Sequence, residues 1–507
     1  MTRPASHDAG AAALPVRIEG KKSGTGEAMS DRAVSRHVRA CRVWVAAVTA
    51  LLCAACAPRE ARLPADSNAD QIRTAFVILG EGGVPVVRVI TVASVCPVVD
   101  VDGVPQPMTV RARPATEPLR PTLSPPALSK PSAFPVLTCE LTLSLSVARA
   151  TVGARVLPLP KRAPQRIVVI GDSGCRIKSS DDAFQACNDP EAWPFARVAV
   201  VAAATHPDLV IHVGDYHYRE TACPPGNSGC AGSPWGYGWD AWDADLFTPA
   251  RALFVAAPWV LVRGNHESCF RAGQGWWRFL DPRLLVPGRD CNDARNDDIG
   301  DFSDPYAIPL AADAQFIVFD SSRVGVAPLP ATDPLYKTYI AQMRQAFVLG
   351  SATTHNFFMN HHPILGFAPN PTQTPTGLYP GNGSLQSVLV PLNGERLFPS
   401  NFDALISGHV HLFQAVSYST EQPTQLISGN GGAWADVALP RDLPKGATPS
   451  PGAVIGSIVS TNQSGFMTID RGADGAWRIE ARDRNGRLFT TCTLRDGKTR
   501  CAPETLQ

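Results

Sequence analysis

The segments RIVVIGDSG (Arg166–Gly174) and DLVIHVGDYHY (Asp208–Tyr218) each join a short apolar run to a Gly-Asp pair. Four further segments also end an apolar run in polar residues, namely WVLVRGN (Trp259–Asn265), QFIVFDSS (Gln315–Ser322), NFFMNHHP (Asn356–Pro363) and DALISGHVH (Asp403–His411). Buried strands whose carboxyl ends present polar side chains have this pattern. We therefore expect a central β-sheet core with ligands at its strand ends.

Segments of helical length and period separate several of these runs. They lie at 190–206, 239–257 and 333–350, and Pro249 is expected to break the second. The last third of the chain returns to strand-like segments, at 413–419, 424–430, 465–471, 475–484 and 486–494. The order of elements predicts an α/β (α+β) fold with helices flanking the sheet core.

The region before this core is also rich in β-branched residues. VPVVRVITVASV (84–95) and CELTLSLSVARATV (139–152) alternate partly, and a Pro-rich stretch at 113–135 between them is expected to be a long loop. We predict a β-sandwich-like N-terminal domain at 72–160. The remaining boundaries are a tether at 57–71, the main domain at 166–495 and a C-terminal tail at 496–507.

The first 56 residues have the pattern of a secretory signal. Four arginines precede the apolar run Val43–Ala55, which is short for a membrane span, and small residues lead to Cys56. The residues CAAC resemble a bacterial lipobox, with Cys53 where Leu is usual. A buried helix is the alternative, and a start at Met29 would give a signal of normal length. We expect an exported protein, periplasmic or lipid-anchored to the bacterial envelope.

The cysteines agree with export. The chain has 13 Cys, and those beyond the signal region form an even set, as disulfides in an oxidising compartment require. Proximity suggests the pairs Cys96–Cys139, Cys175–Cys187, Cys223–Cys230, Cys269–Cys291 and Cys492–Cys501. Zinc binding by thiolates is the weaker alternative, because no CxxC pair follows Cys56.

The composition excludes several classes of protein. Of the 507 residues, 44% are hydrophobic and 18% charged, which excludes a disordered, collagenous or coiled-coil chain. The formal net charge of +1 argues against a basic groove that binds nucleic acid as the main functional surface. We therefore expect no nucleic acid as a stable partner.

Five motifs in order carry the chemistry: GDSG (Gly171–Gly174), GDYHY (Gly214–Tyr218), GNHE (Gly264–Glu267), NHHP (Asn360–Pro363) and GHVH (Gly408–His411). Asp, Asn, Tyr and imidazole together suit Fe, Zn or Mn. One metal could not use so many ligands, whereas two metals that share a bridging carboxylate could. The set predicts a binuclear metal centre.

This ordered set resembles the calcineurin-like metallophosphoesterases, whose pattern is D-x-[HG], GD-x-x-[DY], GNH[ED], a lone His and GH-x-H. The subtype is similar to the purple acid phosphatases, because Gly174 replaces the usual His and Tyr218 supplies a phenolate. The two changes go together, since Tyr218 can take the ligand position that is lost with the His. The resemblance implies a four-layer α/β/β/α sandwich, here preceded by the N-terminal β-rich domain.

The resemblance also implies the metal ligands. The first metal, Fe(III) in this subtype, would be held by Asp172, Asp215, Tyr218 and His411. The second, a divalent Fe, Zn or Mn, would be held by Asn265, His361 and His409, with Asp215 as the bridge. In NHHP the ligand usually precedes Pro by two, which selects His361 and leaves His362 as a phosphate contact, although the two could exchange roles.

The remaining roles concern the substrate. His266 matches the residue that protonates the leaving group, and the predicted substrate contacts are Asn265, His266 and His362. Glu267 is expected to orient the loop. We expect a hydrolase of small phosphate esters that uses a metal-activated hydroxide, most simply a phosphomonoesterase of the acid phosphatase type. The alternative is a phosphodiesterase acting on nucleotides, nucleic acid or phospholipid head groups.

Three other features have two interpretations each. The aromatic segments 235–247 and 275–279 could stack on a nucleobase or an aryl group, but core packing is favoured. The long loop Gly366–Leu385 is the candidate substrate rim. His206, His212, His217 and His355 are expected to be hydrogen-bonded structural residues.

Overall fold

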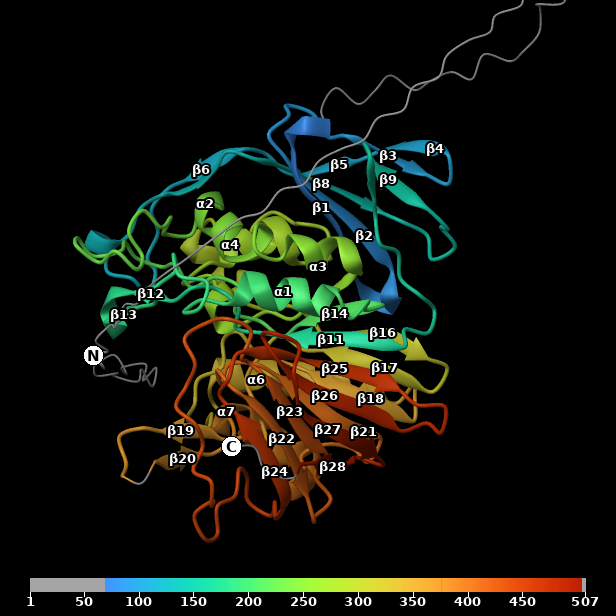
Figure 1. Cartoon of the computed structure of the whole chain (residues 1–507), viewed down its shortest axis with the longest axis vertical. Coiled ribbons are helices and arrows are strands. Elements are labelled where there is room, and N and C mark those ends of the chain that lie inside the picture. The colour runs from blue at the N-terminus through green and yellow to red at the C-terminus, as the bar shows by residue number, and fades with distance from the viewer. Residues whose placement is uncertain (1–68, 375, 504–507) are drawn as a thin grey trace, which may run out of the picture. The chain divides into compact units, whose positions relative to one another are not determined.

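Two large β-sheets carry the fold (Figure 1). The computed structural model describes residues 69–374 and 376–503, which belong to one compact unit. Within that part the first sheet has 11 strands, in the order β28 (Lys498–Ala502), β27 (Leu488–Arg495), β26 (Trp477–Asp483), β25 (Gly465–Arg471), β11 (Arg166–Ile170), β14 (Leu209–His212), β15 (Trp259–Leu261), β1 (Ile72–Leu79), β2 (Pro85–Thr91), β8 (Leu137–Thr142) and β5 (Thr109–Ala112). The second sheet has seven, in the order β16 (Tyr306–Ala311), β17 (Ala314–Val318), β18 (His355–Met359), β21 (Phe402–Ser407), β23 (Thr424–Ser428), β22 (Phe413–Tyr418) and β24 (Ile455–Thr461).

Helices cover the outer face of each sheet. On the first sheet α1 (Phe195–Ala203) and α3 (Arg251–Ala256) share one core with β11, β14 and β15. On the second sheet α6 (Pro334–Gly350) and α7 (Gly383–Asn393) share another with β17, β18 and β21. A third core joins the inner faces of the two sheets. The four layers α/β/β/α confirm the fold class that the resemblance implied.

Short elements occupy the connections. They are α2 (Trp239–Trp242), α4 (Gly273–Gly275), α5 (Asp297–Gly300), the pairs β6 (Ala115–Glu117) with β7 (Ser132–Phe134), β12 (Ile177–Lys178) with β13 (Ala183–Phe184) and β19 (Ala368–Asn370) with β20 (Gly377–Tyr379), and the helical turns η1 (Ala69–Gln71), η2 (Glu81–Gly83), η3 (Pro126–Leu128), η4 (Ser179–Asp181), η5 (Asp243–Phe247), η6 (Asn265–Glu267), η7 (Trp276–Leu280), η8 (Ala294–Asn296) and η9 (Gly394–Arg396). The predicted break at Pro249 is confirmed, because no helix spans 239–257 without interruption.

The strands at the centre of both sheets are parallel. β11 pairs with β14 and β14 with β15 in the first sheet, and β17, β18, β21 and β23 are successive parallel neighbours in the second. Their carboxyl ends therefore lie together at one edge of each sheet. This arrangement explains why the polar residues after each apolar run can meet.

The N-terminal segment differs from the predicted separate domain. β1 pairs with β15 in parallel, Ile78 opposite Trp259, so β1, β2, β8 and β5 continue the first sheet. A four-stranded sheet of β3 (Val98–Val101), β4 (Val104–Pro107), β9 (Ala150–Val152) and β10 (Arg155–Val156) packs on this extension. The segment 72–160 has two layers, but one layer belongs to the large sheet. The reason is the apolar run of β1, whose residues are buried at all positions but one and need cover on both faces.

The predicted tail at 496–507 also differs from the structure. Residues Lys498–Ala502 form β28, the edge strand of the first sheet, which pairs antiparallel with β27. Cys492 and Cys501 lie opposite each other in this hairpin, so the disulfide fixes the strand. The boundary at 495 therefore falls within a hairpin.

All five proximity pairs of cysteines are confirmed as disulfides: Cys96–Cys139, Cys175–Cys187, Cys223–Cys230, Cys269–Cys291 and Cys492–Cys501. The signal region at 1–56 and most of the tether at 57–71 lie outside the described residues. No helix in the described ranges has both the length and the apolar character that a membrane span needs.

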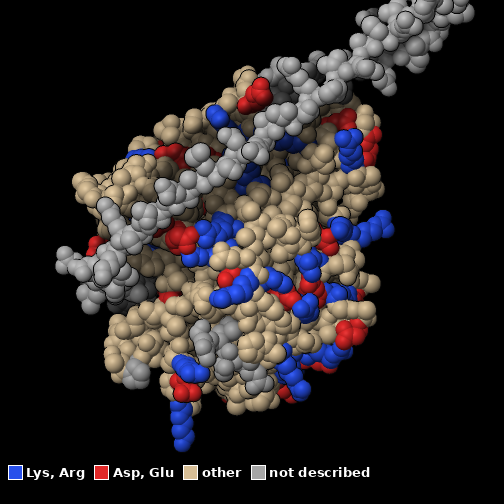
Figure 2. Space-filling model, viewed as in Figure 1, with Lys and Arg blue, Asp and Glu red and all other residues tan. Residues whose placement is uncertain are grey.

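Basic and acidic side chains are interleaved on the face that Figure 2 shows. Several of the surface charges are paired, as in Arg166 with Asp470 and Arg471 with Asp313. Such pairs contribute little to stability, about 0–1 kcal/mol each. The burial of apolar side chains between the layers is the larger stabilising term.

Candidate metal centre

Five loops bring the predicted site residues together. Each loop directly follows one of the strands β11, β14, β15, β18 and β21. In that order they carry Asp172, Asp215, Asn265, His361 and His409. The sequence pattern of an apolar run ending in a polar residue therefore corresponds to one cluster of side chains.

Asp215 lies at the middle of this cluster. Its Oδ2 is 3.2 Å from His361 Nε2, and that nitrogen is 3.0 Å from Asn265 Oδ1. His409 Nδ1 is 3.1 Å from the same amide oxygen. The ligand atoms of Asp215, His361 and His409 all lie within 4.8 Å of one another, as a shared cation requires.

A second group of side chains meets Asp215 from the other side. The Tyr218 hydroxyl is 2.9 Å from Asp215 Oδ2 and 3.1 Å from Asp172 Oδ1. His411 Nε2 is 2.8 Å from the same hydroxyl and 3.5 Å from Asp172 Oδ1. The seven predicted ligands thus form two groups that share Asp215.

The backbone is strained at three of these residues. Asp172, Asp215 and His409 have φ of 55°, 58° and 69°, in the left-handed region. Each such residue costs about 1–3 kcal/mol, and such strain concentrates at functional sites. The turns direct the three side chains toward the cluster as the chain leaves each strand.

Gly264 lets two of the loops approach each other. A Cβ at this position would lie 2.1 Å from Asp215 Oδ1 and 2.3 Å from Asp215 N. These distances are shorter than any van der Waals contact, so a side chain here would displace Asp215. The Gly of the GNHE motif is thus required by packing against the central carboxylate.

Gly174 explains the exchange of ligands seen in the sequence. A Cβ there would lie 2.7 Å from Tyr216 O and 3.0 Å from Tyr218 Cδ2. The ring of Tyr218 therefore occupies the space that a larger residue at 174 would need. The resemblance predicted that Gly174 and Tyr218 occur together, and in this chain the ring of Tyr218 leaves no room for a side chain at 174.

Backbone carbonyls orient two of the imidazoles. His361 Nδ1 lies 2.8 Å from Val213 O, and His411 Nδ1 lies 2.7 Å from Trp434 O. When each Nδ1 donates its proton to the carbonyl, Nε2 keeps a lone pair for the cluster. Metal-binding histidines are commonly held in this way.

Glu267 organises the loops and does not face the cluster. Its carboxylate accepts backbone N–H groups from Asp215 at 3.0 Å, Tyr216 at 2.9 Å and Gly264 at 3.1 Å. Burial and then the nearby charge of Asp215 raise the pKa of Glu267 to about 8. The geometry agrees with the orienting role expected from the sequence.

His266 lies beside the cluster with its two nitrogens in different surroundings. Nδ1 is 3.0 Å from His217 O and 3.3 Å from Glu220 Oε1, while Nε2 is 3.8 Å from Asp215 Oδ2. Burial, followed by the charge of Arg271, holds the pKa of His266 well below its usual value. The neutral ring therefore carries its proton on Nδ1 and presents Nε2 to the centre.

Burial and neighbouring charges compete at the centre. Burial opposes the charge of Asp215, but His361 and His266 outweigh it and lower the pKa of Asp215 well below the usual value. Burial also opposes protonation of His361, but Asp215 outweighs it and raises the pKa of His361 to about 9. Burial and then the charges of Asp215 and Asp172 raise the pKa of Tyr218.

These residues fit a pair of metal ions. Two carboxylates and a phenol gather in a site where Asp172 and Asp215 are 0% and 1% exposed, and imidazole and amide ligands complete the set. Positive charge here would favour the phenolate and displace a proton from His361 Nε2, while Nδ1 keeps its proton. Oxygen and nitrogen donors of this kind suit Fe, Zn and Mn.

His362 lies beside the cluster. Its Nδ1 is 3.1 Å from Ser321 Oγ, and its ring centre is 4.3 Å from that of His409. Ser321 Oγ also accepts the backbone N–H of His361 at 3.2 Å. Of the two histidines in NHHP, His361 is the one whose Nε2 lies 3.2 Å from Asp215 Oδ2, and its assignment as a ligand stays a prediction.

Sequence reasoning missed Asp245, which supports the loop of Tyr218. Its carboxylate accepts backbone N–H groups from Cys175 at 3.0 Å and Tyr218 at 2.7 Å, and it pairs with Arg219. Asp245 lies in the aromatic segment 235–247, where no motif marks it.

Three of the remaining histidines have structural partners, as expected. His212 Nε2 is 2.9 Å from Ser173 Oγ, and burial lowers the pKa of His212 to about 3. His217 Nε2 is 2.9 Å from Gly236 O, and His355 pairs with Asp403.

The favoured interpretation of the aromatic segments also agrees with the structure. The tryptophans Trp239, Trp242, Trp276 and Trp277 are buried. They belong to the core that α1 and α3 share with the first sheet. These rings therefore pack inside the protein and do not line a binding surface.

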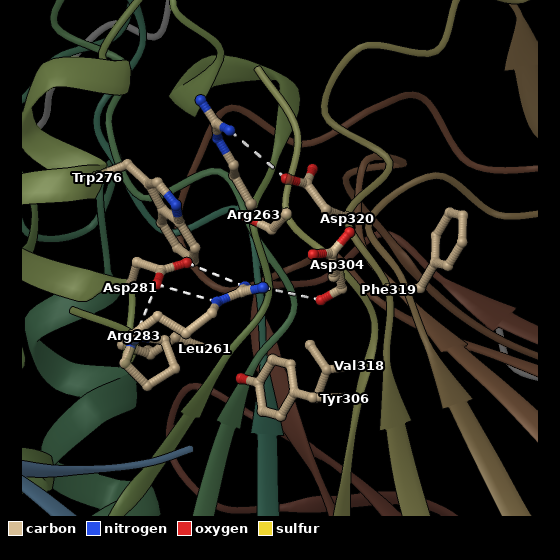
Figure 3. Close-up of a pocket in the computed structure, with 12 residues that line it drawn as sticks. Leu261, Arg263, Trp276, Asp281, Arg283, Asp304, Tyr306, Val318, Phe319 and Asp320 are labelled. Carbon is tan, nitrogen blue, oxygen red and sulfur yellow. Dashed lines mark hydrogen bonds and ion pairs between the residues drawn. The ribbon is translucent and has the colours of Figure 1, made fainter. Parts of the chain in front are cut away.

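A polar pocket adjoins the loop after β15 but holds none of the predicted ligands (Figure 3). Arg283 pairs there with Asp281, and Arg263 lies 3.5 Å from Asp320. Arg263 Nε also donates to Glu267 O at 2.9 Å. The pocket belongs to a network that holds the Gly264–Glu267 loop against the second sheet.

Comparisons with known proteins agree with this geometry. The family model for calcineurin-like phosphoesterases matches residues 165–413. The purple acid phosphatase PPD1 from yellow lupin (Lupinus luteus) seeds aligns with a TM-score of 0.51 and 14% identity, over 84% of this chain and 74% of that one. The structure of PhoD aligns with a TM-score of 0.47 and 10% identity, over 85% of this chain and 91% of that one. No curated protein matches the chain. The lupin structure shows a shared fold.

Proposed function

We propose that this member of the calcineurin-like phosphoesterases is a binuclear phosphomonoesterase of the acid phosphatase type. The chain belongs to that family through residues 165–413 and is a metal-dependent phosphoric ester hydrolase. The observation that carries the proposal is the meeting of Tyr218 with both Asp172 and Asp215 in one buried cluster. A phenol placed between two carboxylates is explained by a cation that all three bind.

We assign the ligands as the sequence predicted. Asp172, Tyr218 and His411 would hold the first ion, Asn265, His361 and His409 the second, and Asp215 would bridge. The ions would be Fe(III) and a divalent Fe, Zn or Mn. When bound, they supply positive charge against the phosphate oxygens and acidify water.

The chain itself supplies the groups around the ester. The amide oxygen of Asn265 lies close to His361 and His409, the other ligands of the second ion. The Nδ2 protons of Asn265 can therefore turn toward a phosphate oxygen. His266 presents Nε2 to the centre and would pass a proton to the departing alkoxide. Because burial disfavours the imidazolium form, that proton must arrive with the substrate or from solvent.

The preference for monoesters is supported by the Gly174 and Tyr218 pair, which resembles the purple acid phosphatases. A phosphodiesterase acting on nucleotides, nucleic acid or phospholipid head groups would use the same ions. The test compares hydrolysis of 4-nitrophenyl phosphate with that of bis(4-nitrophenyl) phosphate, with Asp215→Ala as the blank. A monoester preference that disappears in the variant supports the proposal, and a diester preference contradicts it.

We also propose that the protein works outside the cytoplasm, in the periplasm or on a lipid anchor. The five disulfides support an oxidising compartment. Fractionation of the producing cells tests this proposal. Recovery of the protein with reduced cysteines from the cytoplasm would contradict it.

A further inference from the structure

Two aromatic side chains are exposed, one in a loop next to the centre and one in the hairpin β19–β20. Among the large hydrophobic residues of the described ranges that are exposed, the only aromatics are Tyr379, 40% exposed, and Trp434, 41% exposed. The tryptophans that the sequence marked, such as Trp242 and Trp277, are buried. The ring of an exposed Trp offers a large apolar face on which a flat ring can stack.

Trp434 belongs to a loop that is tied to the metal centre. Its carbonyl oxygen accepts His411 Nδ1 at 2.7 Å. One residue earlier, the Ala433 N–H donates to Asp172 O at 2.9 Å, and two residues later Asp436 accepts the His411 N–H at 2.9 Å. The backbone at Trp434 is therefore fixed to two predicted ligands while the ring remains in solvent.

Tyr379 lies in the hairpin β19–β20, which packs near the Trp434 loop through Ala368. Tyr379 lies directly opposite Ala368 in the antiparallel pair, so the two side chains lie on one face of the hairpin. Ala368 packs against the cluster of Val410, which stands between His409 and His411 in the sequence. Leu439, five residues after Trp434, packs on the same cluster. The two aromatic residues thus belong to segments that both pack against the cluster of Val410.

We infer that Trp434, supported by the neighbouring hairpin that carries Tyr379, binds a flat aromatic ring on the leaving group of the substrate. The inference rests on the proposed function, which it deepens. A ring on the ester oxygen would extend from the centre toward the rim, where an indole face can stack on it. Stacking on an aromatic side chain depends little on ring identity, so a nucleobase and a simple aryl group share this chemistry.

The test is a comparison of kcat/KM for substrates with and without a ring, in the wild type and in Trp434→Ala. The substrates are adenosine 5′-monophosphate, 4-nitrophenyl phosphate and glycerol 3-phosphate. We expect Trp434→Ala to lower kcat/KM about tenfold for the ring-bearing esters, through KM, and to leave glycerol 3-phosphate within about twofold. A decrease for adenosine monophosphate alone would identify a nucleobase, and a decrease for both would identify a general aromatic subsite.

Two further variants separate stacking from folding. Trp434→Phe keeps a ring and should retain most of the activity toward the aromatic esters. Trp235→Ala removes a half-buried tryptophan whose ring centre lies 4.7 Å from Lys130 Nζ, outside the centre, and should change none of the ratios. An equal decrease for all three substrates, or no decrease, would overturn the inference.

A binding measurement keeps the two proposals distinguishable. Saturation-transfer NMR of adenosine 5′-monophosphate should give strong signals from the purine protons with the wild type and weak ones with Trp434→Ala. A wild type that hydrolyses none of the esters would refute the proposed function, while the expected difference in purine signals would still support the aromatic rim. Purine signals of equal strength in the two proteins would refute the rim.

Discussion

On one side of Asp215 lie a carboxylate, a phenol and an imidazole, from Asp172, Tyr218 and His411. On the other side lie an amide and two imidazoles, from Asn265, His361 and His409. We call these the acidic half and the neutral half. Hard, anionic oxygen ligands favour an ion of higher charge, whereas imidazole and amide suit a divalent ion. The difference supports the proposal that the two positions hold different ions.

The supports behind the two halves also differ. In the neutral half His361 Nδ1 faces a backbone carbonyl, Val213 O. Beside the acidic half, His266 Nδ1 faces the buried carboxylate of Glu220, which pairs with Arg271. A backbone carbonyl, Trp434 O, also orients His411 in the acidic half, so the halves differ in the buried charge of Glu220, which lies beside the acidic half alone. Variants that remove single groups can test this asymmetry.

The largest effect is expected where the halves join. Asp215→Asn keeps the size of the side chain but removes the shared charge, so both halves should lose affinity. We expect kcat toward 4-nitrophenyl phosphate to fall by at least about 10³-fold. Asp313→Asn is the matched control, because Asp313 is a surface residue paired with Arg471. Activity of Asp215→Asn within tenfold of the wild type would contradict the assignment of Asp215 as the ligand that both halves share.

Glu220→Gln tests the buried charge behind His266. Burial opposes ionisation of Glu220, but Arg271 and His266 outweigh it and lower its pKa below the ordinary value of 4.5. A depressed pKa stabilises the fold above about pH 4.5, and the contribution declines as the pH falls further. Loss of one partner of a buried pair costs about 3 kcal/mol.

Urea unfolding measures this effect. The free energy of unfolding should be about 3 kcal/mol lower for Glu220→Gln than for the wild type at pH 7, and the difference should shrink below about pH 4.5. A difference that does not change with pH would mean that the carboxylate acts through packing and not through charge.

Tyr218→Phe acts on the acidic half alone. It removes the hydroxyl and keeps the ring that fills the space beside Gly174. We expect loss of the visible absorption of an iron–phenolate pair and a fall in activity of about 10- to 100-fold. Tyr216→Phe is the control, since its hydroxyl donates to Val262 O at 2.9 Å, outside the centre. An absorption band that persists in Tyr218→Phe would remove Tyr218 from the ligand set.

Gly174→Ala is expected to have the smallest effect. The added methyl group meets Tyr216 O and the Tyr218 ring, and overpacking of this kind costs about 1–3 kcal/mol. The melting temperature should fall, and the absorption band should shift as Tyr218 moves. Gly325→Ala is the control, because its nearest neighbour would be Ser384 Oγ at 3.9 Å. Equal melting temperatures for the two variants would contradict the steric explanation.

The polar residues at strand ends could be predicted because their position follows from local rules. An apolar run such as Val168–Ile170 followed by Gly171 and Asp172 predicts a strand and its ligand together. The disulfides also followed from sequence, since each joins two cysteines that are successive in the chain.

Features that depend on contacts between distant segments could not be read in this way. The pairing of β1 with β15 depends on which sheet edge is open, and no residue in 72–79 encodes that choice. The support of Tyr218 by Asp245 joins segments that only the fold brings together. Trp434 differs from the buried tryptophans in exposure and not in sequence pattern.

Metal content tests the central claim most directly. Inductively coupled plasma mass spectrometry should find two ions per chain in the active wild type, with iron as one of them. It should find about one in Asp172→Asn and about one in Asn265→Ala, and the ion that remains in Asn265→Ala should be iron. A fully active wild type with one ion or none per chain would contradict the account.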